Sequence, residues 1–297
     1  MMFDCVIVGG GIAGLQAAIQ LSRYQHNVVV IDAKDGRSNL CRCYHNVLGF
    51  PNGVSGQELR DTGEKQAQEL DVQFLNDRVK KITKIEHGFE FLLSNHSSII
   101  GKRVLLATGV KDRIPLLPEL KACLGMSVYV CPDCDGYEIK DKKALILGSG
   151  DVGAHMAITL HYFSKDLTYI NHERKPLSAE VKQELESKGI TYVESQIKQV
   201  ITDGSQFKQV IVEDGTAITA NHAFVAFGGN KVNSELAEQL GVELYKNKHV
   251  LVNQRTKMTN VEHVWAAGDV VAHSEQVTIA MGDGMQAAIW IHKTLLP

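Results

Sequence analysis

The chain has 297 residues, which is long for one compact core and favours two domains of ordinary size. Hydrophobic residues make up 44% and charged residues 22%, as in ordered globular proteins, and the formal net charge is −3. This charge provides no broad basic surface for nucleic acid or an acidic membrane, so we expect neither partner.

The N-terminus leads directly into the strand-like stretch 3–8, without a basic leader or a long apolar run, so we expect a cytoplasmic protein. Six cysteines in so long a chain are too few for a disulfide framework in a reducing compartment. Cysteines that are close in sequence therefore indicate chemistry.

The first 32 residues read as strand, glycine-rich turn, helix and strand. Residues 3–8 precede the motif GGGIAG, an amphipathic stretch covers 12–24, and a second strand ends at Asp32. Glycines at this spacing give a tight turn, a close approach to pyrophosphate and close helix packing, and the acid accepts ribose hydroxyls. These glycines are Gly9, Gly11 and Gly14. Glycines that only shape a loop would not need the matching strand, helix and acid, so we predict a dinucleotide site.

The same order returns near the middle of the chain. KKALIL leads into GSGDVG, a helical stretch covers 154–163, and LTYIN follows as a strand. The glycines of this motif are Gly148, Gly150 and Gly153. The two motifs are too far apart for a solenoid repeat, so we predict an α/β protein with two Rossmann-like domains.

The remaining segments complete these domains. We expect a long loop over 36–56, a helix over 59–70, β-hairpin strands that end in the buried stretch before Gly109, and a final helix over 276–295. The first domain is predicted to be discontinuous, over 1–112 and 231–297, and the second to cover 116–229.

The sequence VCPDCDGYE contains the most reactive candidate group. Cys131 and Cys134 are three positions apart, a spacing that allows a small-ring disulfide and commonly lowers the pKa of one thiol. Asp135 follows directly and can exchange a proton with a thiol. Half of a zinc site and a pair of buried cysteines are the alternatives, but the nearby histidines lack the spacing of zinc ligands, so we predict no metal.

Over nearly its full length the chain resembles the low-molecular-weight thioredoxin reductase family. Four motifs match in order: GGGIAG with Asp32, LLATG ending at Gly109, CPDCDGYE before the second glycine motif, and AAGDV at 266–270. The resemblance implies the pyridine nucleotide-disulfide oxidoreductase fold, with two FAD/NAD(P)-binding domains, each of three layers (ββα). It also implies FAD as cofactor, a homodimer, and a thioredoxin-like protein or a small disulfide as substrate.

The resemblance assigns roles to individual residues. Cys134 contacts the flavin, Cys131 attacks the substrate disulfide, and Asp135 donates the proton. The residues assigned to FAD are Gly9, Gly11, Gly14, Asp32, Asn46, Ala107, Thr108, Gly109, Gly268, Asp269, Gln276 and Val277.

The second nucleotide site departs from the family pattern. NADPH-dependent members have His-Arg-Arg at the end of the second strand of this domain, because a 2′-phosphate needs charged partners. This chain has Asn171, His172 and Glu173 there, Arg174 is displaced by one place, and Leu177 replaces a later Arg. The second site would therefore use Gly148, Gly150, Gly153, Glu173 and Arg174, and either NADH or NADPH remains open as donor. The family's Arg before Gln276 is also replaced, by Glu275.

The loop over 36–56 holds a second close pair, Cys41 and Cys43. These thiols are either a second redox pair or free thiols, and the CxC spacing, which is short for an unstrained disulfide, favours free thiols. His45 and Asn46 in the same loop are candidates for hydrogen bonds to the flavin.

These features support an FAD-dependent thiol-disulfide oxidoreductase. Two related hypotheses keep the flavin and the dithiol: a dithiol oxidase that passes electrons to oxygen, and a reductase supplied by ferredoxin or another non-nicotinamide donor. A hypothesis of another class is a flavin-dithiol redox sensor without turnover, although no appended partner-binding element supports it.

Overall fold

The computed structural model describes residues 2–297, which form two units by their internal contacts. Unit 1 contains the chain up to Asn39, Ser55–Lys111 and Lys231–Pro297. Unit 2 contains Leu40–Val54 and Asp112–Asn230. Within the described residues, no helix combines the length and the apolar character needed to cross a bilayer.

Unit 1 contains the first βαβ element, the hairpin strands and the C-terminal helix. Its elements are β1 Met2–Val8, α1 Ile12–Arg23, β2 Val28–Ile31, η1 Arg37–Asn39, α2 Gly56–Gln68, β3 Gln73–Leu75, β4 Val79–Ile85, β5 Gly88–Leu93, β6 Ser98–Leu106, β7 Val110–Lys111, β16 Lys231–Val232, α6 Glu235–Gln239, β17 Val264–Ala266 and α7 Val277–Leu295.

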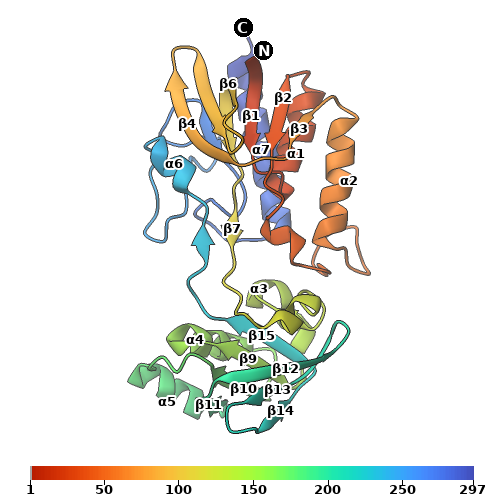
Figure 1. Ribbon diagram of the computed structural model, residues 1–297, viewed down its shortest axis with the longest axis vertical. Helices are drawn as coiled ribbons and strands as arrows, with labels where there is room; N and C mark the ends of the chain where they lie inside the picture. The colour runs from red at the N-terminus through yellow and green to blue at the C-terminus, as the bar shows by residue number, and fades with distance from the viewer. Residues whose placement is uncertain (1) are drawn as a thin grey trace. The chain divides into compact units, whose positions relative to one another are not determined.

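The seven-stranded sheet of unit 1 runs in the order β3-β2-β1-β6-β5-β4, with β17 also paired to β6 (Figure 1). Strands β3, β2, β1, β6 and β17 are parallel, whereas β6, β5 and β4 form an antiparallel meander. Alternate residues of β1 point to opposite faces, as the two-residue period of a strand requires. Cys5 and Ile7 join the core beneath α1 and α7, whereas Val6 and Val8 join the core on the other face.

Unit 2 also has a parallel sheet, with helices on one face and antiparallel strands on the other. Its elements are η2 Pro118–Ala122, β8 Val128–Tyr129, α3 Pro132–Asp135, η3 Gly136–Ile139, β9 Ala144–Gly148, α4 Gly150–Leu160, β10 Leu167–Asn171, α5 Ala179–Ser187, β11 Thr191–Val193, β12 Ile197–Asp203, β13 Gln206–Val212, β14 Ala217–Thr219 and β15 His222–Ala226. The parallel sheet has the order β11-β10-β9-β15-β8, and β12-β13-β14 form a separate antiparallel sheet (Figure 1). One core lies between the parallel sheet and the helices α4 and α5, and another lies beneath β12–β14.

The predicted α/β fold with two Rossmann-like, three-layer units is confirmed. The helix expected over 154–163 begins earlier, at Gly150, because its first turn contains the glycine motif itself. One segment also differs from the expected boundaries: residues 40–54 group with unit 2. Leu40 packs against the core of unit 2, and Arg42 accompanies it with hydrogen bonds to the backbone of Ala122 and Leu124.

Candidate functional site

The two cysteines of the CxxC motif lie at the start of the short helix α3 in unit 2. Cys131 precedes the helix in an extended conformation, and Pro132 fixes the backbone of the first helical position. The Cys131 sulfur accepts hydrogen bonds from the backbone N–H of Cys134, at 3.3 Å, and from the Cys134 thiol, at 2.6 Å. The bond from Cys134 lowers the pKa of Cys131, although burial opposes this shift. The helix therefore brings the two sulfurs together and favours a thiolate at Cys131.

Asp135 is the last residue of α3 and is buried. Burial, with a smaller contribution from the nearby charge of Glu138, raises its pKa to about 7. The next residue, Gly136, packs directly against the ring of Phe163, with which a Cβ at this position would collide. A carboxyl group with this pKa can both give and take a proton near neutral pH.

The segment 40–54 contributes further thiols to unit 2. Cys43 lies 3.3 Å from Nε2 of His45, whose Nδ1 lies 3.5 Å from a carboxylate oxygen of Glu138. The Cys41 thiol instead donates to the carbonyl of Cys43. Burial raises the pKa of Cys41 to about 12 and also raises that of Cys43. Both side chains are free thiols that stay protonated near neutral pH, so the interpretation as unreactive cysteines has the stronger support.

The first glycine turn connects β1 to α1 in unit 1. A Cβ on Gly9 would collide with the carbonyl of Ala107, and one on Gly14 would collide with the carbonyl of Gly9. These contacts explain why both positions need glycine. A Cβ on Gly11, in contrast, would meet no atom within 4 Å. The first turn of α1 also contains no acidic residue. The backbone at Gly11 is therefore open to an anionic group at the N-terminal end of a helix.

Asp32, at the end of β2, has a partner that the sequence did not reveal. Nη2 of Arg60, on α2, lies 2.6 Å from Oδ2 of Asp32, and both side chains are buried. The pairing compensates the cost of burying both charges and fixes the acid beside the glycine turn. Sequence spacing could not have identified Arg60, because it follows Asp32 by 28 residues on a separate element.

Thr108 lies where β6 ends. Its hydroxyl donates to the carbonyl of Asn233, at 2.6 Å, and the Asn233 amide donates back to the carbonyl of Thr108, at 2.8 Å. The backbone N–H of Asn233 also bonds the carbonyl of Gly109, which has a positive φ of 64°. These bonds hold Ala107, Thr108 and Gly109 at the carboxyl end of the parallel strands, where ligands bind in folds of this kind.

A network of charges surrounds the AAGDV motif. Nη1 of Arg37 lies 3.0 Å from Oδ2 of Asp269 and is also paired with Glu275, which in turn lies 3.1 Å from Nε2 of His249. Glu275, the residue that departs from the family pattern, thus has a cationic partner within unit 1. Arg37 was missed by the sequence analysis, which had no pattern that links it to Asp269.

The glycine of AAGDV is fixed by a second cluster. The backbone N–H of Gly268 donates to Oδ2 of the buried Asp283, at 3.1 Å, and Asp283 is paired with Lys257 and His273. Gln276 then precedes α7, and Val277 is the first residue of that helix. The residues assigned to FAD therefore lie in unit 1, except Asn46, which belongs to the segment that groups with unit 2.

The predicted second nucleotide residues already have partners within the protein. Glu173 forms ion pairs with Arg113 and with Lys175, and it accepts a hydrogen bond from Ser149, at 2.7 Å. The bonds from Lys175 and Ser149 lower the pKa of Glu173 to about 2. Arg174 is paired with Glu213 instead of facing the glycine turn.

Comparison with known proteins agrees with this arrangement. Residues 3–284 match the model of the pyridine nucleotide-disulphide oxidoreductase family. The chain belongs to that family. It is 29% identical to a thioredoxin reductase of Coxiella burnetii, over 96% of this chain and 93% of the relative. It is also 29% identical to a thioredoxin reductase of Mycolicibacterium smegmatis, over 96% of this chain and 94% of that relative.

Solved structures of the pyridine nucleotide-disulphide oxidoreductase fold extend the comparison. The crystal structure of a putative thioredoxin reductase from Bacillus anthracis has a TM-score of 0.84 and 28% sequence identity, with 98% of each chain covered. The predicted resemblance to thioredoxin reductases is thus confirmed, and the protein is an oxidoreductase of a family that acts on disulfides. Thioredoxin reductase-like members carry FAD, and the open backbone at Gly11 fits its pyrophosphate.

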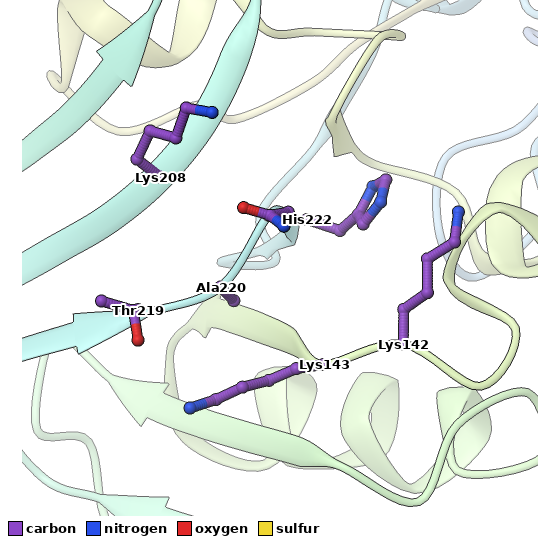
Figure 2. A pocket seen from close by; sticks show the side chains of 7 residues that line it. Lys142, Lys143, Lys208, Thr219, Ala220 and His222 are labelled. Carbon is purple, nitrogen blue, oxygen red and sulfur yellow. The ribbon is translucent and has the colours of Figure 1, made fainter.

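A basic hollow of about 300 Å³ also lies on unit 2 of this oxidoreductase. Figure 2 shows three lysines and a histidine around it, drawn from β13, the start of β15 and the segment before β9. They are Lys142, Lys143, Lys208 and His222. The hollow involves neither glycine turn nor the dithiol. Among the described residues, no group of three or more histidine, cysteine or acidic side chains is arranged to hold a metal ion.

Proposed function

We propose that the protein is an FAD-dependent thiol-disulfide oxidoreductase in which Cys131 and Cys134 are the redox pair. The observation that carries the proposal is the 2.6 Å contact between the two sulfurs, with a lowered pKa at Cys131 and a carboxyl group of pKa about 7 at Asp135. A thiolate, a second thiol and a proton carrier are the groups that thiol-disulfide exchange needs.

Cys131 is proposed as the nucleophile towards the substrate. Its thiolate attacks one sulfur of the substrate disulfide and forms a mixed disulfide, and the other substrate sulfur leaves as a thiolate that takes up a proton. Cys134 then attacks Cys131, which releases the second substrate sulfur and closes the Cys131–Cys134 disulfide. Asp135 donates a proton to a departing sulfur. The substrate gains two electrons from the dithiol and two protons, one from the Cys134 thiol and one from Asp135, and the dithiol becomes a disulfide.

Unit 1 is proposed as the holder of FAD, which supplies the two-electron chemistry that returns the disulfide to a dithiol. Gly9, Gly11 and Gly14 would receive the pyrophosphate, and Asp32, fixed by Arg60, would bind ribose hydroxyls. The other residues proposed to surround the cofactor are Ala107, Thr108, Gly109, Gly268, Asp269, Gln276 and Val277. Cys134 is proposed as the sulfur that exchanges electrons with the flavin.

The substrate is proposed to be a thioredoxin-like protein or a small disulfide, which follows from the names of the two bacterial relatives. A homodimer and a cytoplasmic location remain predictions from the sequence. The dithiol oxidase is the second candidate, with the same residues and the opposite electron flow. Its distinguishing property is oxygen consumption during dithiol oxidation.

The proposal can be tested by trapping thiols. Oxidised holoprotein is reduced at the flavin by light under anaerobic conditions, alkylated with iodoacetamide, and mapped by mass spectrometry. We expect new alkylation at Cys131 and Cys134, and none at the fully buried Cys5 and Cys123, whose pKa values are raised by burial. Flavin reduction that leaves the 131–134 disulfide unchanged would refute the proposed electron path.

A further inference from the structure

The two glycine turns have the same sequence spacing but different surroundings. The space beside Gly11 is open, whereas a Cβ on Gly150 would lie 3.1 Å from Cβ of Lys175 and 3.7 Å from the carbonyl oxygen of Pro176. Gly150 also has a positive φ of 53°, whereas Gly11 is extended with φ −78°. The surface that pyrophosphate would approach in the second turn is therefore covered by the chain that follows β10.

The hydrogen-bonding capacity of the second turn is also occupied. The backbone N–H of Gly150 donates to Oδ1 of Asn171, at 3.0 Å, and Asn171 is fully buried. The Asn171 amide is itself fixed by bonds to the carbonyl of Lys175, at 2.7 Å, and to the Tyr192 hydroxyl, at 3.0 Å. A phosphate would have to displace a buried and fully bonded side chain to reach this N–H, which costs free energy.

The start of helix α4 at the second turn also carries an acid, Asp151. Its Oδ1 accepts the backbone N–H of Ser178 at 2.9 Å. This bond attaches the far end of the covering segment to the same helix. The Ser149 hydroxyl, which could also donate to a phosphate, is instead hydrogen-bonded to Glu173. An acid at a helix N-terminus takes the position that the helix dipole offers to an anion and repels a second one.

We propose that residues 171–178 form a built-in plug, which fills the second dinucleotide turn in place of a ligand. The plug excludes NADH and NADPH by packing and by its own hydrogen bonds, and not only by the loss of a 2′-phosphate clamp. Unit 2 then keeps the Rossmann layers as a carrier of the dithiol. This inference rests on the proposed function. It requires that the two electrons per disulfide come from a reductant that reaches the flavin without a nucleotide site on unit 2.

The test compares nicotinamides with a reductant that needs no nucleotide site, on oxidised holoprotein under anaerobic conditions. Binding of NADPH and of NADH is measured by calorimetry, and flavin reduction by absorbance. We expect no binding up to about 1 mM of either nucleotide, which places Kd above that value. We also expect no bleaching on the time scale of turnover, but complete bleaching by reduced methyl viologen. Micromolar binding, or rapid bleaching by either nucleotide, overturns the plug.

A charge variant separates packing from electrostatics. Glu173→Gln removes the negative charge and keeps the side-chain size. Since packing by Lys175 and Pro176 remains, we expect the variant to bind neither nucleotide. Micromolar binding by this variant would show that charge alone closes the site and would overturn the inference. Amide hydrogen exchange adds a structural readout: the Gly150 N–H should exchange slowly, and saturating NADPH should leave its rate unchanged. Acceleration of this exchange by NADPH would show that the plug opens.

Failure of the inference and failure of the proposed function give different results. A nucleotide that bleaches the flavin refutes the plug, while the dithiol chemistry stands if Cys131 and Cys134 then become reduced. Viologen that bleaches the flavin but leaves the 131–134 disulfide intact refutes the proposed function, whatever the nucleotides do.

Discussion

The Cys134 thiol donates a hydrogen bond to the Cys131 sulfur across 2.6 Å. This bond gives the two cysteines different roles, because one sulfur is the donor and the other the acceptor. The acceptor gains thiolate character, because a negative sulfur is stabilised by the donated proton. Cys134 is the donor in this bond and is therefore the sulfur left to close the disulfide after Cys131 has reacted.

Replacement of Cys134 by Ser should leave FAD bound and reduce disulfide turnover by on the order of a thousandfold or more, because the second attack has no sulfur to perform it. Steady-state rates and the flavin spectrum measure the two effects. Cys43→Ser is the matched control and should retain most of the activity, since its thiol is not part of the pair. Normal turnover in Cys134→Ser would exclude the proposed relay.

Asp135 should give the reaction a pH dependence near neutrality. Its folded-state pKa is about 7, so the protonated donor is lost as pH rises through that value, and the rate should fall about tenfold per pH unit above it. Asp135→Asn should be slower by about 100-fold or more at pH 6 and should lose this limb of the profile. The profile of kcat/KM tests the assignment, and an unchanged limb in the variant would assign it to another group.

The raised pKa of Asp135 also predicts that the stability of the folded protein falls as pH rises. Its pKa is raised from 3.8 to about 7, so the folded state binds a proton more tightly than the unfolded state does. This contribution is fully present below pH 3.8 and is lost as pH rises through about 7. Urea unfolding at pH 6 and pH 8.5 should therefore show a larger loss of stability for the native protein than for Asp135→Asn. Equal losses in the two proteins would contradict the expectation.

Gly11→Val should fold and yet lose FAD, because no protein atom lies within 4 Å of the added Cβ while the pyrophosphate approach is filled. Gly11→Ala should weaken FAD binding by less. Circular dichroism checks the fold, and the absorbance of the purified protein checks the cofactor. A Gly11→Val protein that stays fully yellow would show that the cofactor lies elsewhere.

Arg60→Met should destabilise the protein by about 3 kcal/mol, because it leaves the buried Asp32 carboxylate without its partner. Arg78→Met removes an exposed ion pair with Asp35 and should cost less than about 1 kcal/mol. Adding Asp32→Asn to Arg60→Met should restore part of the loss, since no charge then stays buried alone. Chemical unfolding measures all three, and equal losses for the two Arg variants would contradict the buried pair.

Local patterns were sufficient to predict much of this molecule. The glycine motifs are bordered by apolar strands and amphipathic helices, so the two Rossmann-like units followed from residues close in sequence. The CxxC motif likewise indicated its own chemistry. These features depend on spacings that a reader of the sequence can count.

Pairings between distant elements could not be predicted in this way. Neither the partnership of Arg60 with Asp32 nor that of Arg37 with Asp269 leaves a periodic signal. The plug illustrates the same limit: the sequence showed that Asn171 and Glu173 replace the expected basic residues, but not that the next residues cover Gly150. The grouping of residues 40–54 with unit 2 depends on packing by Leu40 and on backbone bonds by Arg42, which are ordinary residues in a loop.

The short ladder of β7 and β16 has a consequence for how such a molecule can change over time. It pairs Lys111 with Lys231 and Val110 with Val232, so the chain leaves unit 1 and re-enters it at adjacent points. Residues 112–230 begin and end next to this ladder, so this segment can be exchanged for another of similar span without rearrangement of unit 1. The unit that is proposed to bind FAD can thus persist while this inserted segment changes.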